Sequence, residues 1–199
     1  MSIQLVECPR DAMQGLPEFV PPEIKINYLN ALLKVGFHTL DFGSFVSPKA
    51  IPQMRDTADV LEKLELTENT KLLAIVANVR GAEQAVAFEQ ISYLGFPLSV
   101  SETFQQRNTN ASVSEALETV AQIQHLCIKH HKTLVVYLSM GFGNPYGDPY
   151  SAQYLVDFTA KLDKLGVKIV APSDTVGSST PVLIKQIFEQ LIPAFKHIT

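Results

Sequence analysis

The sequence has little cysteine, no excess of positive charge and no long apolar run. Its two cysteines, Cys8 and Cys127, are too few for a disulfide-stapled secreted fold and are not paired like metal ligands, so we expect a reducing, cytoplasmic compartment. A formal net charge of -4 excludes the basic surface that nucleic acids or anionic membranes require. Neither a membrane span nor a signal peptide is visible. The expected partner is a small molecule or another protein.

The sequence does contain enough hydrophobic residues, 46% of 199, to build a sizeable core in one domain spanning residues 1–199. A short apolar run, a loop and a helical pattern recur about every 30 residues. The runs show little alternation, which is typical of parallel strands buried on both faces. The six expected strands are Gln4–Glu7, Thr39–Phe42, Leu72–Ala77, Phe96–Val100, Thr133–Leu138 and Lys168–Ala171.

The expected helices begin and end at familiar signals, either an N-cap residue followed by proline or acid, or a closing glycine. No linker or low-complexity tract separates the units, which favours one domain. The signals are Pro22, Gly36, the capping box of Ser112 with Glu115, the pairs Asp148-Pro149 and Thr180-Pro181, and Gly166.

Two α/β architectures accept this pattern, an open doubly wound sheet and a closed (β/α)8 TIM barrel. The first expected strand is followed by C-P-R-D-A-M-Q at residues 8–14 instead of G-x-G-x-x-G, which weakens the dinucleotide-binding alternative. Ile198-Thr199 lies where a seventh strand could begin. We therefore expect a (β/α)8 barrel with about six of its eight units present, truncated before the last two.

In a parallel barrel the active site lies at the carboxyl ends of the strands. Polar residues gather at these positions, whereas the opposite end carries only a basic rim. The residues that follow the six strands are Arg10, Asp11 and Gln14; Asp41 and Ser44; Asn78; Ser101 and Glu102; Ser139 and Gly141; Ser173, Asp174 and Thr175.

A guanidinium and a carboxylate at a barrel mouth are costly unless they serve each other or a ligand. Arg10-Asp11 therefore either binds a ligand or only ties down its loop, and Asp41 and Asp174 could equally be turn formers. If Asp11, Asp41 and Asp174 converge, they form an oxygen-rich site suited to Mg²⁺ or Mn²⁺.

Other chemistry-bearing residues give weaker signals. Cys127 lies on an apolar helix and is expected to be a small buried hydrophobe, whereas Cys8 stays ambiguous. Residues 141–148 are rich in glycine but lack the G-K-[ST] ending of a phosphate-binding loop. We therefore interpret them as a flexible loop at the mouth of the barrel.

Three segments together resemble a known family. Residues 7–14 (E-C-P-R-D-A-M-Q), 41–54 (D-F-G-S-F-V-S-P-K-A-I-P-Q-M) and 173–177 (S-D-T-V-G) resemble, in order and spacing, the signatures of 3-hydroxy-3-methylglutaryl-CoA lyases. The resemblance covers essentially the whole chain. The S-F-V-S-P-K-x-x-P-Q-M run is its most specific part, because related isopropylmalate and homocitrate synthases share the R-D and D-T elements but not this run.

The resemblance implies a TIM-barrel lyase that cleaves 3-hydroxy-3-methylglutaryl-CoA to acetyl-CoA and acetoacetate with Mg²⁺ or Mn²⁺. Cys8 and Ala12 depart from the family's usual glycines, and the remaining family metal ligands are expected beyond Thr199. The implied roles are metal ligand for Asp11, enolate stabilisation for Arg10, pocket shaping for Gln14, a catalytic carboxylate at the family's glutamate position for Asp41, support of acid/base chemistry for Asp174, and substrate binding for Ser44, Ser139 and Thr175.

Two alternatives remain open at this point. One is another acyl-CoA aldol-type lyase of the same superfamily, and the other is a non-catalytic truncated barrel that binds a partner through its open edge. An acyl-CoA substrate is expected in the enzymatic cases, with neither nucleic acid nor membrane as partner. The oligomeric state is not fixed by the sequence, a homodimer being one option.

Overall fold

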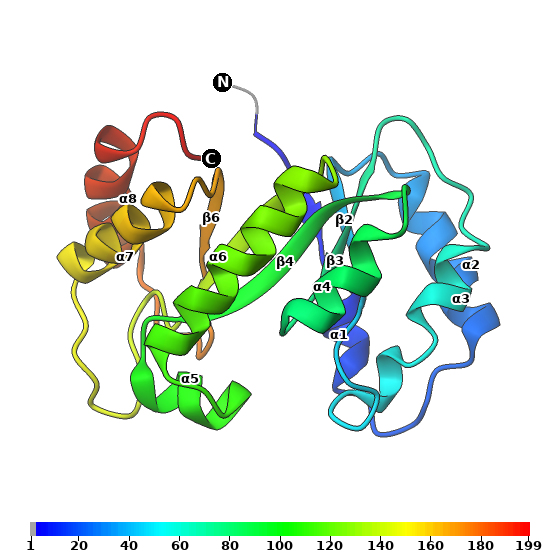
Figure 1. The fold of residues 1–199 in the computed structure, drawn as a ribbon, viewed down its shortest axis with the longest axis horizontal. Helices are drawn as coiled ribbons and strands as arrows, with labels where there is room; N and C mark the ends of the chain where they lie inside the picture. The colour runs from blue at the N-terminus through cyan, green and yellow to red at the C-terminus, as the bar shows by residue number, and fades with distance from the viewer. Residues whose placement is uncertain (1–2) are drawn as a thin grey trace. The chain divides into compact units, whose positions relative to one another are not determined.

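A computed structural model describes residues 3–199 as alternating strands and helices (Figure 1). All six expected strands are present, with ends that differ by a few residues. The strands are β1 (Val6–Glu7), β2 (Thr39–Ser44), β3 (Lys71–Ile75), β4 (Ile91–Ser99), β5 (Thr133–Ser139) and β6 (Ile169–Pro172). The helices are α1 (Pro9–Gln14), α2 (Pro22–Leu33), the 3₁₀ turn η1 (Pro52–Met54), α3 (Thr57–Leu61), α4 (Val79–Val86), α5 (Glu102–Thr109), α6 (Val113–Lys129), α7 (Ala152–Lys164) and α8 (Pro181–Ala194).

The order of the strands decides between the two architectures. Hydrogen-bonded neighbours follow the chain order β1-β2-β3-β4-β5-β6, and β1 with β2, β2 with β3 and β5 with β6 pair in parallel. A doubly wound sheet would reverse direction at a switch point, whereas a barrel adds each strand beside the previous one. The fold class is therefore α/β with β/α units in TIM-barrel order, which confirms the prediction.

The chain divides into two compact units, Met1–Leu94 and Gly95–Thr199, with the boundary inside β4. In the first unit every residue of β2 is buried, and α2 contributes Leu29 and Leu33 to the core beside it. The extent of the domain, 1–199, stays a prediction.

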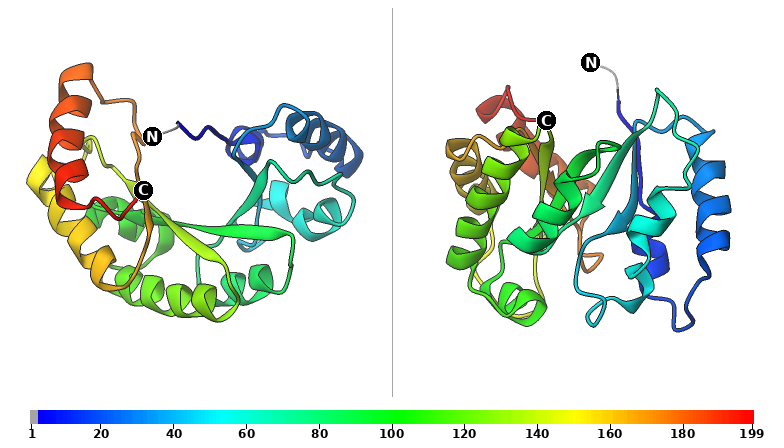
Figure 2. Two further views of the ribbon diagram at one scale, coloured as in Figure 1. Left: turned by 90° about the horizontal axis from the view of Figure 1, so that it is seen from above. Right: turned by 45° about the vertical axis from the view of Figure 1, so that its right-hand side comes forward.

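In the second unit α6, α7 and α8 lie on one face of β5 and β6 (Figures 1 and 2). Helix α6 buries Val120, Ile123 and Cys127, a helical spacing that gives one apolar stripe. Cys127 is only 1% exposed, and burial raises the pKa of its thiol to about 12, so it is the inert core residue that the sequence predicted.

Strands β1 and β6 correct one expectation. Both were predicted to be buried on both faces, but Val6 is 49% exposed and every residue of β6 is half-buried. The backbone of Thr199 runs beside β6: its N–H donates to Lys168 O, and Val170 N–H donates to Thr199 O. These two hydrogen bonds have the pattern of parallel strand pairing. A seventh strand beginning at Ile198-Thr199 stays a prediction, because β6 is the last strand of the described sheet.

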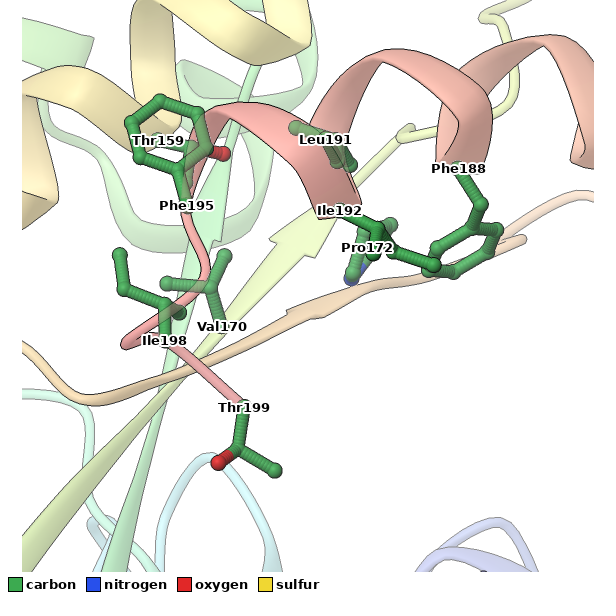
Figure 3. Close-up of a pocket in the computed structure, with 9 residues that line it drawn as sticks. All are labelled: Thr159, Val170, Pro172, Phe188, Leu191, Ile192, Phe195, Ile198 and Thr199. Carbon is green, nitrogen blue, oxygen red and sulfur yellow. The ribbon is translucent and has the colours of Figure 1, made fainter. Parts of the chain in front are cut away.

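An apolar pocket lies between α8 and β6 (Figure 3). Phe188, Leu191 and Phe195 of the α8 segment line it, together with Val170 and Pro172 of β6. None of the helices within residues 3–199 has the length and apolarity needed to cross a bilayer.

The helix signals are confirmed except at one position. Ser112 and Glu115 form the reciprocal capping box, and Thr180 Oγ1 accepts from Leu183 N–H ahead of Pro181. Asp148-Pro149 was predicted to open a helix, which is wrong. Helix α7 begins at Ala152, and its N-cap is Ser151, because the Asp148 carboxylate binds other partners.

We predict that Ser112→Ala lowers the free energy of unfolding by about 1 kcal/mol, because the first-turn amide of Glu115 loses its acceptor. Urea denaturation measures the loss. The matched control is Ser114→Ala, an exposed serine two residues along the same helix, which should change stability by less than about 0.5 kcal/mol. Equal losses in both variants would contradict the capping role.

Candidate active site

The first cluster of predicted site residues lies in the first unit, where α1 follows β1. Arg10 is on α1 and Asp41 is in the middle of β2, where its side chain is 1% exposed. Arg10 Nη2 donates to Asp41 Oδ2 at 2.6 Å, and Arg10 Nε donates to Oδ1 and Oδ2 at 3.2 and 3.1 Å. This forked contact fixes the plane of the guanidinium.

The remaining edge of the guanidinium meets the other two predicted residues. Arg10 Nη1 donates to Asp11 Oδ1 at 3.0 Å and to Gln14 Oε1 at 2.9 Å, and Gln14 Nε2 donates to the same Asp11 oxygen at 3.0 Å. The side chain of Asp11 is 64% exposed. Four residues singled out from the sequence therefore form one network that runs from a buried carboxylate to an exposed one.

Two titratable groups of this network are perturbed. Burial raises the pKa of Asp41, and the hydrogen bonds and charge of Arg10 oppose that rise. Burial and the Asp41 charge raise the pKa of the neighbouring Cys8 thiol to about 11. Cys8 is therefore largely protonated at neutral pH, which disfavours the thiolate that a nucleophile needs.

The segment that carries the most specific family motif has a structural role in this unit. Gln53 is buried; its Oε1 accepts from Val20 N–H at 2.8 Å, and its Nε2 donates to Glu18 O at 2.9 Å. Lys25 Nζ donates to Asp56 Oδ1 at 2.6 Å and also contacts Gln53 O. The motif thus fastens the chain ahead of α2, a role that the sequence did not reveal because the partners lie about 30 residues apart.

Ser44 closes β2 and is 2% exposed. Its Oγ accepts from Val46 N–H at 3.2 Å, and its own N–H donates to Thr57 Oγ1. The hydroxyl therefore shapes the loop after β2, and its predicted substrate contact stays a prediction.

The other three predicted residues lie in the second unit, at the ends of β5 and β6. Ser139 is buried at the end of β5, and Thr175 Oγ1 accepts from the N–H of the next residue, Met140, at 2.8 Å. Asp174 is exposed, and its two carboxylate oxygens accept from Ser178 N–H and Ser179 N–H at 2.8 and 3.1 Å. The roles predicted for these residues stay predictions.

The hydrogen bonds of Asp174 also lower its pKa, with the Ser179 side chain as the largest cause and the amides of Ser179 and Ser178 adding to it. Asp174 is therefore ionised at neutral pH. By binding the amides of Ser178 and Ser179, Asp174 acts as a turn former, one of the two roles that the sequence left open.

The second unit also contains a polar cluster that sequence reasoning missed. Asp148, from the loop between β5 and α7, accepts from Ser101 Oγ at 2.5 Å and from both the N–H and Oγ1 of Thr103 at 2.9 Å. Residues 141–148 were interpreted as a flexible loop, but Asp148 and Asn144 hold them with side-chain hydrogen bonds. The available sequence signal, an aspartate before a proline, pointed to a helix start instead.

A preformed metal centre is not found within residues 3–199, where no group of three or more His, Cys, Asp or Glu side chains has suitable geometry. Asp11 and Asp41, both in the first unit, meet through Arg10, and a shared site with Asp174 of the second unit stays a hypothesis. Asp41 has its carboxylate turned to Arg10, and Asp174 has its carboxylate turned to backbone amides.

Comparison with known proteins gives the family. The model of the HMGL-like family matches residues 3–199. The chain belongs to the HMGL-like family. It is 32% identical over 187 residues to the hydroxymethylglutaryl-CoA lyase YngG of Bacillus subtilis, covering 94% of this chain and 62% of that protein. It is 31% identical to the mitochondrial hydroxymethylglutaryl-CoA lyase of Mus musculus, covering 92% and 56%.

Solved structures agree with this family assignment. The HMG-CoA lyase of Bacillus subtilis superposes with a TM-score of 0.91 at 31% identity, covering 96% of this chain and 64% of that one. An HMG-CoA lyase from Acinetobacter baumannii, in complex with coenzyme A and 3-methylmalate, gives 0.89 at 28% identity, covering 96% and 62%. The chain spans about three fifths of the length of these HMGL-like relatives.

We predict that the Cys8 thiol reacts slowly with iodoacetamide. In a Cys127→Ala background, a pKa of about 11 makes alkylation at pH 8 on the order of 100-fold slower than for an ordinary exposed cysteine. The rate should rise about tenfold per pH unit up to pH 10, because only the thiolate reacts. Adding Asp41→Asn should lower the pKa of Cys8, since the variant removes a neighbouring negative charge. A plateau reached near pH 9 would contradict this account.

Proposed function

We propose that the protein is a carbon–carbon lyase that cleaves 3-hydroxy-3-methylglutaryl-CoA to acetyl-CoA and acetoacetate. The observation that carries this proposal is the Arg10 guanidinium, whose Nε and Nη2 are held by Asp41 and whose Nη1 binds Asp11 and Gln14 at the end of β1. The family membership of the chain supports the same chemistry. The proposed substrate is accordingly an acyl-CoA thioester.

The reaction needs one proton removed and one developing charge stabilised. The C3 hydroxyl of the substrate loses its proton to a base, the C2–C3 bond breaks, and C3 becomes the ketone of acetoacetate. The bonding electrons pass to the thioester as an enolate, which takes up a proton at C2 to give acetyl-CoA. A fixed cation aimed at the enolate oxygen lowers the barrier because charge appears there only during the reaction.

In this proposal Arg10 stabilises the enolate oxygen, Asp41 holds Arg10 in place and Gln14 shapes the pocket wall. Asp41 is suited to its role because a buried carboxylate with three contacts to one guanidinium leaves that guanidinium little freedom. Asp174, ionised at neutral pH, supports proton transfer. Ser44, Ser139 and Thr175 are proposed to border the substrate.

One residue of the site suits a divalent cation. The Asp11 carboxylate is exposed, and carboxylate oxygens are the ligands that Mg²⁺ and Mn²⁺ prefer. Asp11 would contribute one oxygen ligand, and within residues 3–199 it is the one ligand proposed. A bound cation would supply Lewis-acid polarisation of the substrate oxygens. A cytoplasmic location stays a prediction, since both cytoplasmic and mitochondrial lyases are among the relatives. A homodimer also stays a prediction.

We predict that Arg10→Lys in the natural full-length protein lowers kcat for acetoacetate release by about 100- to 1,000-fold, because a lysine has a single side-chain nitrogen and cannot both bind Asp41 and reach the enolate oxygen. The assay measures acetoacetate and acetyl-CoA with Mg²⁺ or Mn²⁺ present and again after chelation, which should abolish turnover.

The matched control is Arg80→Lys, an exposed arginine on α4, which should keep full activity. Thermal melting of each variant separates loss of folding from loss of catalysis. Unchanged turnover in Arg10→Lys would overturn the role given to Arg10. Absence of 3-hydroxy-3-methylglutaryl-CoA cleavage by the unaltered protein would overturn the proposed function, and cleavage of a different acyl-CoA in its place would favour the related aldol-type lyase.

A further inference from the structure

The loop that joins β5 to α7, residues 140–151, is bound to the end of β6 along its first part. Gly141 N–H donates to Ser173 O at 3.0 Å, and Ser178 Oγ donates to Phe142 O at 3.0 Å. There is no room for a side chain at position 141, because a Cβ would lie 2.8 Å from Leu138 O. This close backbone packing fixes where the loop begins.

The last part of the loop is bound to a different element, the start of α5. Asp148 takes three hydrogen bonds there, from Ser101 Oγ at 2.5 Å and from Thr103 N–H and Oγ1 at 2.9 Å. Ser101 is fully buried and its Oγ also accepts from Phe104 N–H, so one hydroxyl both caps α5 and binds the loop. A carboxylate at a helix N-terminus is further stabilised by the helix dipole.

Asn144 braces the loop between its two attachments. Asn144 Oδ1 accepts from Tyr146 N–H at 3.0 Å and from Asp148 N–H at 3.1 Å, while Asn144 Nδ2 donates to Asp148 O. Tyr150 OH closes the loop by donating to Gly141 O at 3.0 Å. The loop is therefore one rigid bridge between the carboxyl ends of β4, β5 and β6, and Asp148 is its attachment to α5.

We propose that Asp148 is a positioning residue that fixes the β5–α7 loop in the arrangement that binds the acyl-CoA substrate. This inference rests on the proposed function, because the loop starts directly after Ser139 and shares Met140 with Thr175, two of the residues proposed to border the substrate. Asp148 touches no reacting atom. It acts through the loop, and its loss should weaken substrate binding more than the chemical step.

The test compares Asp148→Asn with Asp157→Asn, a matched change at an exposed aspartate on α7. The asparagine keeps the shape but removes the negative charge, so the hydrogen bonds to Ser101 and Thr103 lose the strength that the charged acceptor gives them. We expect KM for 3-hydroxy-3-methylglutaryl-CoA to rise about tenfold with kcat changed less than threefold. Asp148→Glu should restore part of the lost affinity.

Amide hydrogen exchange of residues 140–151 supplies a readout that does not need activity. Protection of these amides should fall in Asp148→Asn, while α7 and the Asp157→Asn protein stay unchanged. If exchange is faster in Asp148→Asn but the unaltered protein does not cleave the substrate, the attachment of the loop is confirmed and the proposed function is wrong. Unchanged KM together with faster exchange would overturn the positioning role, and unchanged exchange would overturn the attachment itself.

Discussion

The pairing of Arg10 with Asp41 is the interaction on which the candidate site depends. A carboxylate that is 1% exposed in the middle of β2 is costly unless it is paired, and removing its partner typically costs about 3–5 kcal/mol. Arg10 satisfies both carboxylate oxygens, which joins α1 to β2 and leaves Nη1 for Asp11 and Gln14. One ion pair thus joins two elements and holds the guanidinium in one orientation.

The site residues differ in how tightly the fold constrains them. Asp41 is immobilised inside β2, whereas Asp11 keeps an exposed carboxylate within the same network. In the second unit, Thr175 and Asp148 both bind backbone amides of other segments, so they hold loops in place. Side chains that hold loops in this way limit the motion of the segments they join, which the proposed acyl-CoA site would require.

Local patterns in the sequence predicted the local parts of this structure. The apolar runs identified all six strands, and Ser112 with Glu115 marked the start of α6, because both signals depend on neighbours within a few residues. Asp148 was misassigned because Ser101 and Thr103, its partners, lie 47 and 45 residues away in the chain. The apolar run alone did not show that β1 is exposed, since burial of a strand depends on what packs against it; exposure of the first strand was expected only from the truncated-barrel alternative. Arg10, Asp11 and Gln14 lie beside Asp41 because α1 directly follows β1, which pairs with β2.

The central claim is that Arg10, held by Asp41, stabilises an enolate oxygen, and exchange of the acetyl-CoA methyl protons with D₂O tests it most directly. This exchange proceeds through the enolate but needs no carbon–carbon cleavage. The account predicts metal-dependent exchange by the natural full-length protein and a fall of about 100-fold or more in Arg10→Met, with acetyl-CoA binding retained. Equal exchange rates in the two proteins would contradict the role given to Arg10.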